Sequence, residues 1–131
     1  MRTPEQILRE AKTIAIVGAS PDPGRPSHGV MRYLQRVGYR MLPVNPVACP
    51  GEILGVPCAA SLAELAEPVD LVDVFRRPEY CADVAREAAA IGAPALWLQL
   101  GIRSPEARSV AEEAGLDYVE DACTAVVHRR V

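Results

Sequence analysis

The 131-residue sequence is poor in the residues that carry most catalytic and metal chemistry. It contains two histidines, one tryptophan, one phenylalanine and a single lysine, which stands beside 13 arginines. Its four cysteines form no C-x-x-C pair, so free or buried thiols are expected rather than disulfides or a zinc site. No Ser-His-Asp order and no pair of carboxylates stands out either. We therefore expect no metal site and no catalytic residues.

The sequence also lacks an apolar run long enough to cross a membrane. The longest, residues 88–102, is interrupted by Gly92, Pro94 and Gln99. The first five residues lack the apolar region of a signal peptide, so a cytoplasmic location is expected. A net charge of −3 gives no general attraction to nucleic acid or to anionic membranes. An anionic ligand would therefore have to be held by local geometry.

Apolar runs alternate with helical patterns along the chain, whose length fits one domain, residues 1–131. Strands are predicted at residues 13–17, 40–44, 69–75, 95–100 and 118–119. Helices are predicted after an N-cap at Ser27, and over residues 61–66, 79–91 and 105–114. This alternation indicates βαβ units with right-handed crossovers. We predict an α/β Rossmann-type three-layer sandwich with a five-stranded parallel sheet of order 3-2-1-4-5, which binds ligands at the carboxyl ends of its strands.

The segment after the first predicted strand, residues 18–29, has features of a phosphate-binding turn. Gly18 permits a tight turn, and the following helix offers free N–H groups and a positive dipole end. The segment matches neither the dinucleotide fingerprint nor the P-loop. It is longer than the roughly 2–6 residues of ordinary βα connections, which favours ligand binding over a plain turn.

The ends of the second and third predicted strands differ from those of NAD-binding sheets. NAD binders place an acid at the second strand end, whereas this chain has Asn45 and Pro46, which would not repel a phosphorylated ribose. Asn45 could equally be a turn former. At the third, Phe75 offers a face for a flat ring, and Arg76 and Arg77 suit phosphate contacts. Cations at a helix start oppose its dipole, which favours a functional interpretation of the two arginines.

The last two predicted strand ends carry weaker signals. Gln99 is the one polar residue in an apolar run before Gly101, and it could contact a ligand or only a neighbouring loop. Cys123 follows the last strand, where a packed cysteine is expected more than a thiol that faces a ligand. His28 and His128 have no partner pattern, and we expect a catalytic role for neither.

Four linked motifs resemble those of a known family. They are Ile-Val-Gly-Ala-Ser-Pro at 16–21, the Tyr-Arg and Pro-Val-Asn-Pro pieces within 39–46, Val-Asp-Val-Phe-Arg-Arg-Pro at 72–78 and Trp-Leu-Gln-Leu-Gly at 97–101. In this order they resemble the stand-alone CoA-binding domain family of bacteria and archaea, over about residues 7–126. That family is similar in turn to the N-terminal domain of the succinyl-CoA synthetase α subunit.

The resemblance implies CoA across the carboxyl edge of the sheet. The residues that it assigns to the phosphate turn are Gly18, Ala19, Ser20 and Pro23. It places Asn45 and Pro46 on the ribose side. It places Phe75, Arg76 and Arg77 over the adenine and pantetheine path, and Gln99 and Gly101 would close the other side. The synthetase has a lysine where this chain has Ala48, so Arg25 or Arg76 is the candidate to supply that phosphate contact. The synthetase's phosphorylated histidine lies in a second domain that this sequence lacks, and no ligase chemistry is implied.

The leading hypothesis is a small cytoplasmic nucleotide-binding module that holds CoA or an acyl-CoA without catalysis. It would have a small-molecule ligand and neither a nucleic-acid nor a membrane partner. Two alternatives stay open. One is an NAD(P)-binding, redox-related module, and the other is an enzyme that acts on CoA thioesters through Cys123 or His28.

Overall fold

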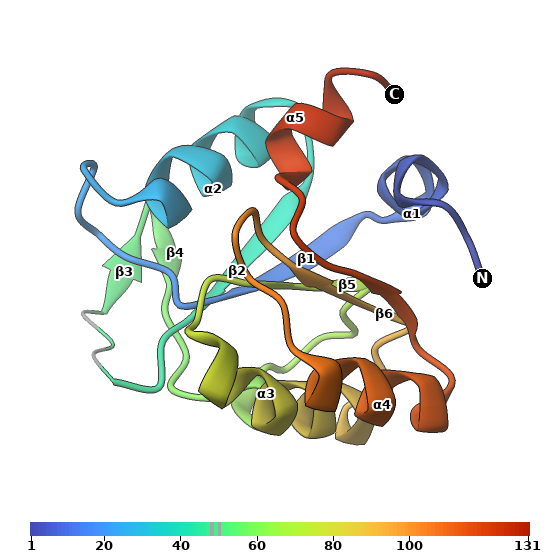
Figure 1. Ribbon diagram of the computed structural model, residues 1–131. Coiled ribbons are helices and arrows are strands. Elements are labelled where there is room, and N and C mark those ends of the chain that lie inside the picture. Colours follow the sequence, from blue (N-terminus) through green and yellow to red (C-terminus); the bar gives the residue numbers. More distant parts are fainter. Residues whose placement is uncertain (48, 50) are drawn as a thin grey trace.

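The computed structural model describes residues 1–47, 49 and 51–131. Its main sheet has five parallel strands in the order β2-β1-β5-β6-β7 (Figure 1). These strands are β1 (Thr13–Val17), β2 (Arg40–Val44), β5 (Leu71–Val74), β6 (Ala95–Leu98) and β7 (Asp117–Val119). Between β2 and β5 lie a hairpin of β3 (Glu52–Ile53) and β4 (Val56–Pro57) and a short 3-10 helix, η1 (Leu62–Glu64).

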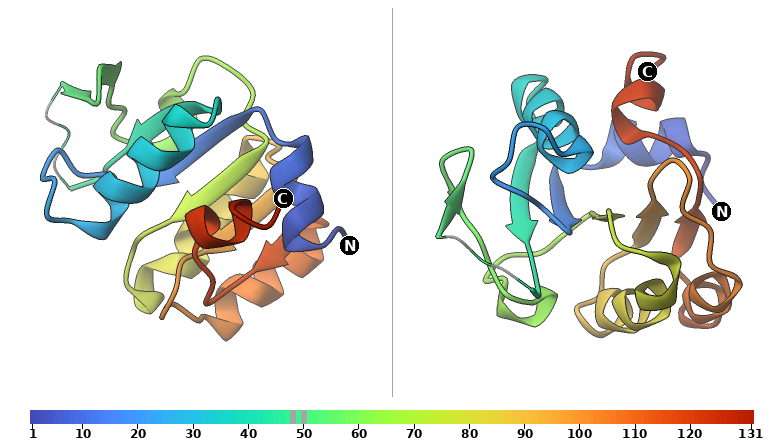
Figure 2. Two further views of the ribbon diagram at one scale, coloured as in Figure 1. Left: turned by 90° about the horizontal axis from the view of Figure 1, so that it is seen from above. Right: turned by 60° about the vertical axis from the view of Figure 1, so that its left-hand side comes forward.

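Helices cover both faces of the sheet, which confirms the predicted three-layer α/β fold (Figure 2). One face carries α1 (Pro4–Glu10), α2 (Pro26–Arg36) and α5 (Thr124–His128). The other carries α3 (Pro78–Ala90) and α4 (Pro105–Ala114). None of the helices in the described ranges is both long and apolar enough to cross a membrane.

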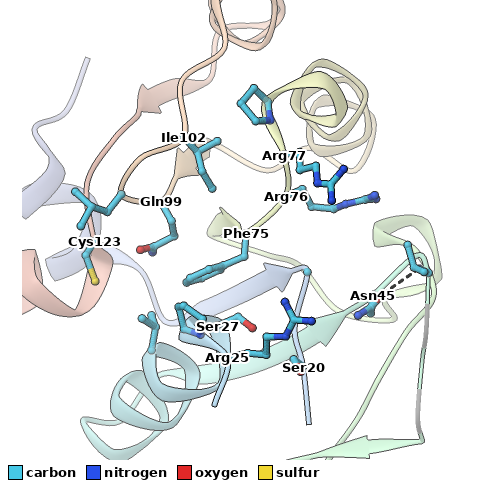
Figure 3. A pocket seen from close by; sticks show the side chains of 16 residues that line it. Ser20, Arg25, Ser27, Asn45, Phe75, Arg76, Arg77, Gln99, Ile102 and Cys123 are labelled. Carbon is cyan, nitrogen blue, oxygen red and sulfur yellow. Dashed lines mark hydrogen bonds between the residues drawn. The ribbon is translucent and has the colours of Figure 1, made fainter. Parts of the chain in front are cut away.

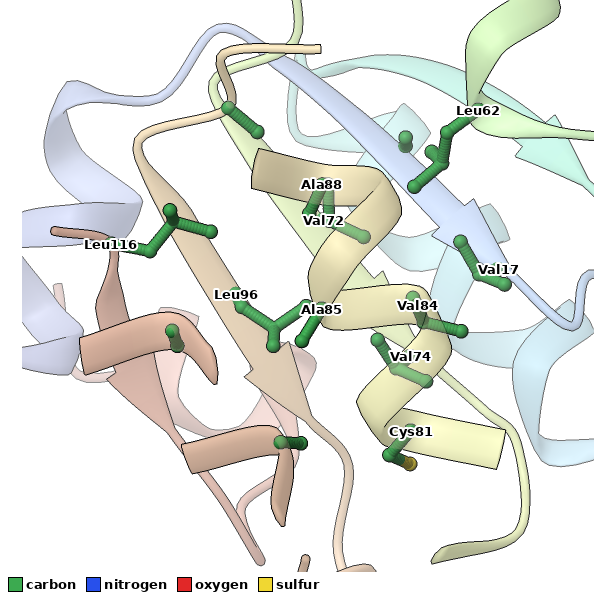
Figure 4. Packing of buried hydrophobic residues seen from close by; sticks show 14 of the residues in the cluster. Val17, Leu62, Val72, Val74, Cys81, Val84, Ala85, Ala88, Leu96 and Leu116 are labelled. Carbon is green, nitrogen blue, oxygen red and sulfur yellow. The ribbon is translucent and has the colours of Figure 1, made fainter. Parts of the chain in front are cut away.

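The strands are apolar on both faces because each face packs against helices. In β1, Ala15 and Val17 point to the α3–α4 side, while Ile14 and Ile16 point to the α1–α2 side. Figure 4 shows α3 lying over β5 and β6 on the first of these sides. The residues that α3 buries there are Cys81, Val84, Ala85 and Ala88. Small side chains on this helix allow it to lie close to the sheet.

The predicted strand order was wrong in the position of the third strand. The prediction put it at the edge beside β2, but β5 pairs with β1 and β6 in the middle of the sheet. The connection from β2 to β5 explains the difference, since Leu62 of η1 packs on the α3 face, opposite α2. The connection from β1 to β2 runs over the α2 face in one direction along the sheet. A right-handed crossover on the other face runs in the other direction, so β5 lies on the far side of β1 from β2.

Several element boundaries also differ from the prediction. The second helix begins at Pro26 with Arg25 at the N-cap, and Ser27 is buried in its first turn. Residues 61–66 form only the one-turn η1, and the side chain of Ser61 caps nothing. Two helices have no counterpart in the prediction: α1, which begins at a capping box between Thr3 and Gln6, and α5.

Candidate functional site

The carboxyl edge of the sheet opens between β1 and β5, where consecutive connections leave toward opposite faces. The chain passes from β1 into α2 on one face, and from β5 into α3 on the other. In open α/β sheets this switch point forms the ligand crevice.

Gly18 makes the crevice possible. Its φ is +92°, and a Cβ built on it would lie 2.3 Å from the carbonyl oxygen of Phe75. The Gly18 N–H donates to the Val44 carbonyl at 2.9 Å, so the turn is held against β2 as well. Any side chain at this position would push the ends of β1 and β5 apart.

The crevice holds a cavity of about 860 Å³, within the roughly 300–1,000 Å³ typical of small-molecule sites. Its lining of 16 residues comes from the strand ends and from the beginnings of α2, α3 and α5 (Figure 3). Eight of the predicted site residues are brought together here: Gly18, Ser20, Arg25, Asn45, Phe75, Arg76, Arg77 and Gln99.

One end of the cavity is positively charged. Its 16 lining residues include three arginines and no Asp or Glu. Arg25 and Arg77 stand at the N-caps of α2 and α3, where no side chain in the described part of the chain caps the helix. Arg76 lies over the Tyr80 ring at 4.2 Å, and within residues 1–47, 49 and 51–131 none of the three arginines pairs with a carboxylate. Cations beside exposed helix N–H groups repel the helix dipole and favour an anion between them.

The other end of the cavity is uncharged. The half-buried ring of Phe75 lies between the arginines and a wall that carries Gln99, Ile102 and Cys123 (Figure 3). Val30 of α2 and Leu100 also line the cavity. A ligand that fits both ends would carry its anionic groups at the arginines and an extended, mostly apolar arm toward Cys123.

A buried polar network lies below Gln99. Its amide nitrogen Nε2 donates to Asp73 Oδ1 at 2.8 Å and to Thr124 Oγ1 at 2.7 Å, and the Thr124 hydroxyl donates to Asp73 Oδ2 at 3.0 Å. Burial raises the pKa of Asp73 to about 7, although both hydrogen-bond partners favour its ionised form. The network joins β5, the end of β6 and the start of α5.

Asn45 lines the cavity, but its side chain also holds two loops together. Its Nδ2 donates to the carbonyl of Ala19 at 2.8 Å, and its Oδ1 accepts the N–H of Val47 at 2.9 Å. These bonds give Asn45 the turn-forming role that the sequence left open. Aspartate here would place a carboxylate oxygen against the Ala19 carbonyl, so its effect would be partly structural.

Four predicted site residues lie outside this cavity. Ala19 is fully buried in the core, and Pro23 is exposed on the first loop. Pro46 lines a separate cavity of about 180 Å³ beside α3. The N–H of Gly101 donates to Asp121 Oδ1 at 2.7 Å, which ties two loops together. Ala48, where the synthetase has a lysine, is outside the described residues.

Sequence reasoning missed the remaining half of the lining: Pro26, Ser27, Val30, Val47, Pro78, Leu100, Ile102 and Cys123. Pro26 and Pro78 are the first residues of α2 and α3, and a search that extended each predicted strand end into the next helical turn would have found them. Cys123 was expected to be packed, but it is only half-buried and lies at the cavity wall. No sequence signal distinguishes it from a packed thiol.

Comparison with known proteins agrees with this geometry. The CoA binding domain family matches residues 12–129. An uncharacterized protein of Bacillus subtilis, YneT, is 41% identical, with 95% of this chain and 90% of YneT covered. The ADP-forming acetate–CoA ligase I of Archaeoglobus fulgidus is 28% identical, but this chain spans only 19% of its length.

Solved structures with the same fold include close relatives. A Thermus thermophilus structure titled cell-free ID.343 superposes with a TM-score of 0.92 at 45% identity, with 98% of each chain covered. A hypothetical protein from Pyrococcus horikoshii gives a TM-score of 0.92 at 37% identity, over 98% of this chain and 92% of its own.

Proposed function

Because this chain belongs to the family of CoA-binding domains, we propose that it binds CoA or an acyl-CoA in the cavity at the carboxyl edge of the sheet, without transforming it. The observation that carries the proposal is the division of the cavity into a charged and an uncharged end. Arg25, Arg76 and Arg77 suit the pyrophosphate and the 3′-phosphate of CoA. The wall from Phe75 to Cys123 suits the pantetheine arm.

The absence of catalysis is also a proposal. Of the 16 lining residues, none is Asp, Glu, His or Lys, and Cys123 is the single thiol among them. General acid–base chemistry needs a titratable group within hydrogen-bond reach of the reacting atom, and these residues offer none besides that thiol. The matched region corresponds to 19% of the length of the acetate–CoA ligase.

Calorimetry with CoA, 3′-dephospho-CoA and NAD tests the binding proposal. We expect a micromolar or tighter Kd for CoA and at least about tenfold weaker binding of NAD, which requires only about 1.4 kcal/mol. Loss of the 3′-phosphate should also weaken binding, because that group would meet an arginine. Equal affinities for CoA and NAD would contradict the assignment.

Two arginines of α2 provide a matched test of the charged end. Arg25 lines the cavity at the start of the helix, whereas Arg36 is exposed in its last turn. Arg25→Ala and Arg76→Ala should each cost about 1.5–3 kcal/mol of CoA binding, as expected for a hydrogen bond to a charged group. Arg36→Ala removes the same charge and should leave the affinity unchanged. Equal effects of Arg25→Ala and Arg36→Ala would place the ligand elsewhere.

Incubation with acetyl-CoA tests the proposed lack of catalysis. The thioester should decay no faster with the protein than in buffer. Turnover that Cys123→Ala abolishes would instead favour an enzyme acting on CoA thioesters.

A further inference from the structure

The network below the cavity fixes the direction in which the Gln99 amide faces. Asp73 and Thr124 are fully buried and Gln99 is 3% exposed, so these groups have little access to water. Both N–H bonds of Gln99 Nε2 are used, one on Asp73 and one on Thr124. An ionised carboxylate can only accept hydrogen bonds, so it requires the NH₂ side of the amide to face it.

The other side of this amide, the carbonyl oxygen Oε1, is left for the cavity. Gln99 lines the cavity, and Oε1 has no hydrogen-bond partner in the described part of the chain. Figure 3 shows Gln99 between Phe75 and Cys123, with its oxygen toward Cys123. None of the fully buried side-chain acceptors in the described residues lacks a partner, so this oxygen keeps contact with solvent in the cavity, where a ligand N–H can take the place of water.

Building on the proposed function, we propose that Asp73 and Thr124 are positioning residues that turn the Gln99 oxygen into the cavity, where it accepts an amide N–H of the pantetheine arm. Phosphate oxygens are acceptors as well, so the Gln99 oxygen disfavours them at this end. It therefore helps to set the direction in which CoA lies, with its phosphates at the arginines and its two amides at the uncharged wall.

Asp73→Asn reverses this arrangement with almost no change of shape. The NH₂ introduced at position 73 can donate to Gln99 Oε1, and the Thr124 hydroxyl can turn to donate to the same oxygen, so the Gln99 amide is no longer held with its NH₂ inward and can present NH₂ to the cavity. An N–H of the ligand would then meet a donor instead of an acceptor. Asp70→Asn is the matched control, because Asp70 precedes β5 at the amino edge of the sheet, where its Oδ2 accepts the N–H groups of Lys12 and Thr13.

The first measurement compares CoA with 3′-phospho-ADP, its nucleotide half, at pH 8, where Asp73 with a pKa of about 7 is mostly ionised. Asp73→Asn should weaken CoA binding roughly tenfold, the equivalent of one lost hydrogen bond. The same variant should change 3′-phospho-ADP binding by less than about twofold, because this ligand lacks the amide arm. Asp70→Asn should leave both affinities unchanged.

The second measurement needs no ligand, and its decisive reading is taken on the wild-type protein. In the free wild-type protein at pH 8, NMR should show slow solvent exchange of the Gln99 side-chain NH₂ protons, because both are bonded to buried groups. Selective ¹⁵N-glutamine labelling resolves these signals, and Gln99→Met identifies them by their loss. In Asp73→Asn the same protons should exchange rapidly.

The outcomes separate this inference from the proposed function. Rapid exchange in the wild type, or equal weakening of CoA and 3′-phospho-ADP by Asp73→Asn, overturns the positioning role and leaves CoA binding standing. A wild-type protein that binds neither ligand overturns the proposed function, and with it the assignment of the Gln99 oxygen to pantetheine.

Discussion

The helices of this protein begin in two different ways, and the difference follows the cavity. Away from the cavity, α1 and α4 begin with Thr3 and Ser104, whose hydroxyls accept backbone N–H groups of the first turn. At the cavity, α2 and α3 begin with Arg25 and Arg77, which accept none in the described residues. Where a helix start serves only the fold, the chain supplies its own acceptor. Where it faces the cavity, His28 and Tyr80 donate only to the backbone carbonyls of Arg25 and Arg77, and no described side chain caps the first turn, at some cost in stability.

The largest effect is expected at Gly18, where the cavity meets the sheet. Gly18→Ala would force a Cβ to 2.3 Å from the Phe75 carbonyl oxygen at a φ of +92°, and should lower the free energy of unfolding by about 4 kcal/mol or more. Gly38 has a φ of +109° but no atom within 4 Å of its Cβ position. Gly38→Ala should therefore cost only about 1–2 kcal/mol. Urea unfolding followed by the fluorescence of Trp97 measures the free energy of unfolding of both variants. Equal losses of stability would mean that the positive φ, and not the contact with Phe75, sets the cost.

Asp73 should make stability depend on pH in the opposite sense to a salt-bridged acid. Burial raises its pKa from 3.8 to about 7, so the folded state holds the proton more tightly than the unfolded state does. Its contribution to stability is complete below pH 4 and falls through pH 7, by up to about 4 kcal/mol at about 1.4 kcal/mol per pH unit. Asp73→Asn should thus gain stability relative to the wild type as the pH rises from 4 to 8. A difference that stays constant over this range would contradict the buried titration.

A cap outside the cavity should matter for stability alone. Ser104 Oγ accepts the N–H of Ala107 at 3.0 Å, and Ser104→Ala should cost about 1 kcal/mol without affecting CoA binding. Ser61 precedes η1 but its side chain makes no cap bond there, so Ser61→Ala should cost far less. Chemical denaturation measures the stability of both variants, and calorimetry measures their CoA affinity. A loss of CoA affinity in Ser104→Ala would contradict the distinction between helix starts that serve the fold and those that serve the cavity.

The smallest effect on stability is expected from adding a cap at the cavity. Arg77→Ser gives α3 the acceptor that α4 already has, and should raise stability by about 0.5 kcal/mol while weakening CoA binding. Arg77→Ala removes the same charge without adding a cap, so it should weaken binding without the gain in stability. If both variants keep the affinity of the wild type, the start of α3 does not hold the ligand.

Local patterns were sufficient for most elements and insufficient for their arrangement. The predicted bounds of β1, β2 and α4 agree with the structure, because each is a regular apolar pattern ended by Gly, Asn or a polar cap. The position of β5 depends on which face of the sheet the β2–β5 connection crosses. No residue in this connection indicates that face. The missed helix α5 has only five residues and is held by packing of Ala125 and Val127 rather than by its own periodicity.

The site residues also divide into those that local patterns predict and those that they do not. Gly18, Arg76 and Arg77 could be found because each lies within three residues of a strand end, and strand ends meet at one edge. Ile102 and Cys123 reach the cavity through loops whose paths are set by distant contacts, such as that of Asp121 with Gly101. The orientation of Gln99 could not be predicted at all, because its partners lie 26 and 25 residues away along the chain.

Both chain ends lie on the α1–α5 side of the molecule, away from the carboxyl edge of β1 (Figures 1 and 2). Ile7 and Leu8 of α1 belong to the same apolar cluster as Val127 of α5, so the two terminal helices are neighbours. A short linker from residue 131 to residue 1 would therefore close the backbone into a ring. Reopening the ring at the exposed turn of Gly92, at the amino edge of β6, would yield a circular permutant with every strand end of the cavity intact. The cavity depends on which elements are adjacent in space, and their order along the chain can be changed without altering it.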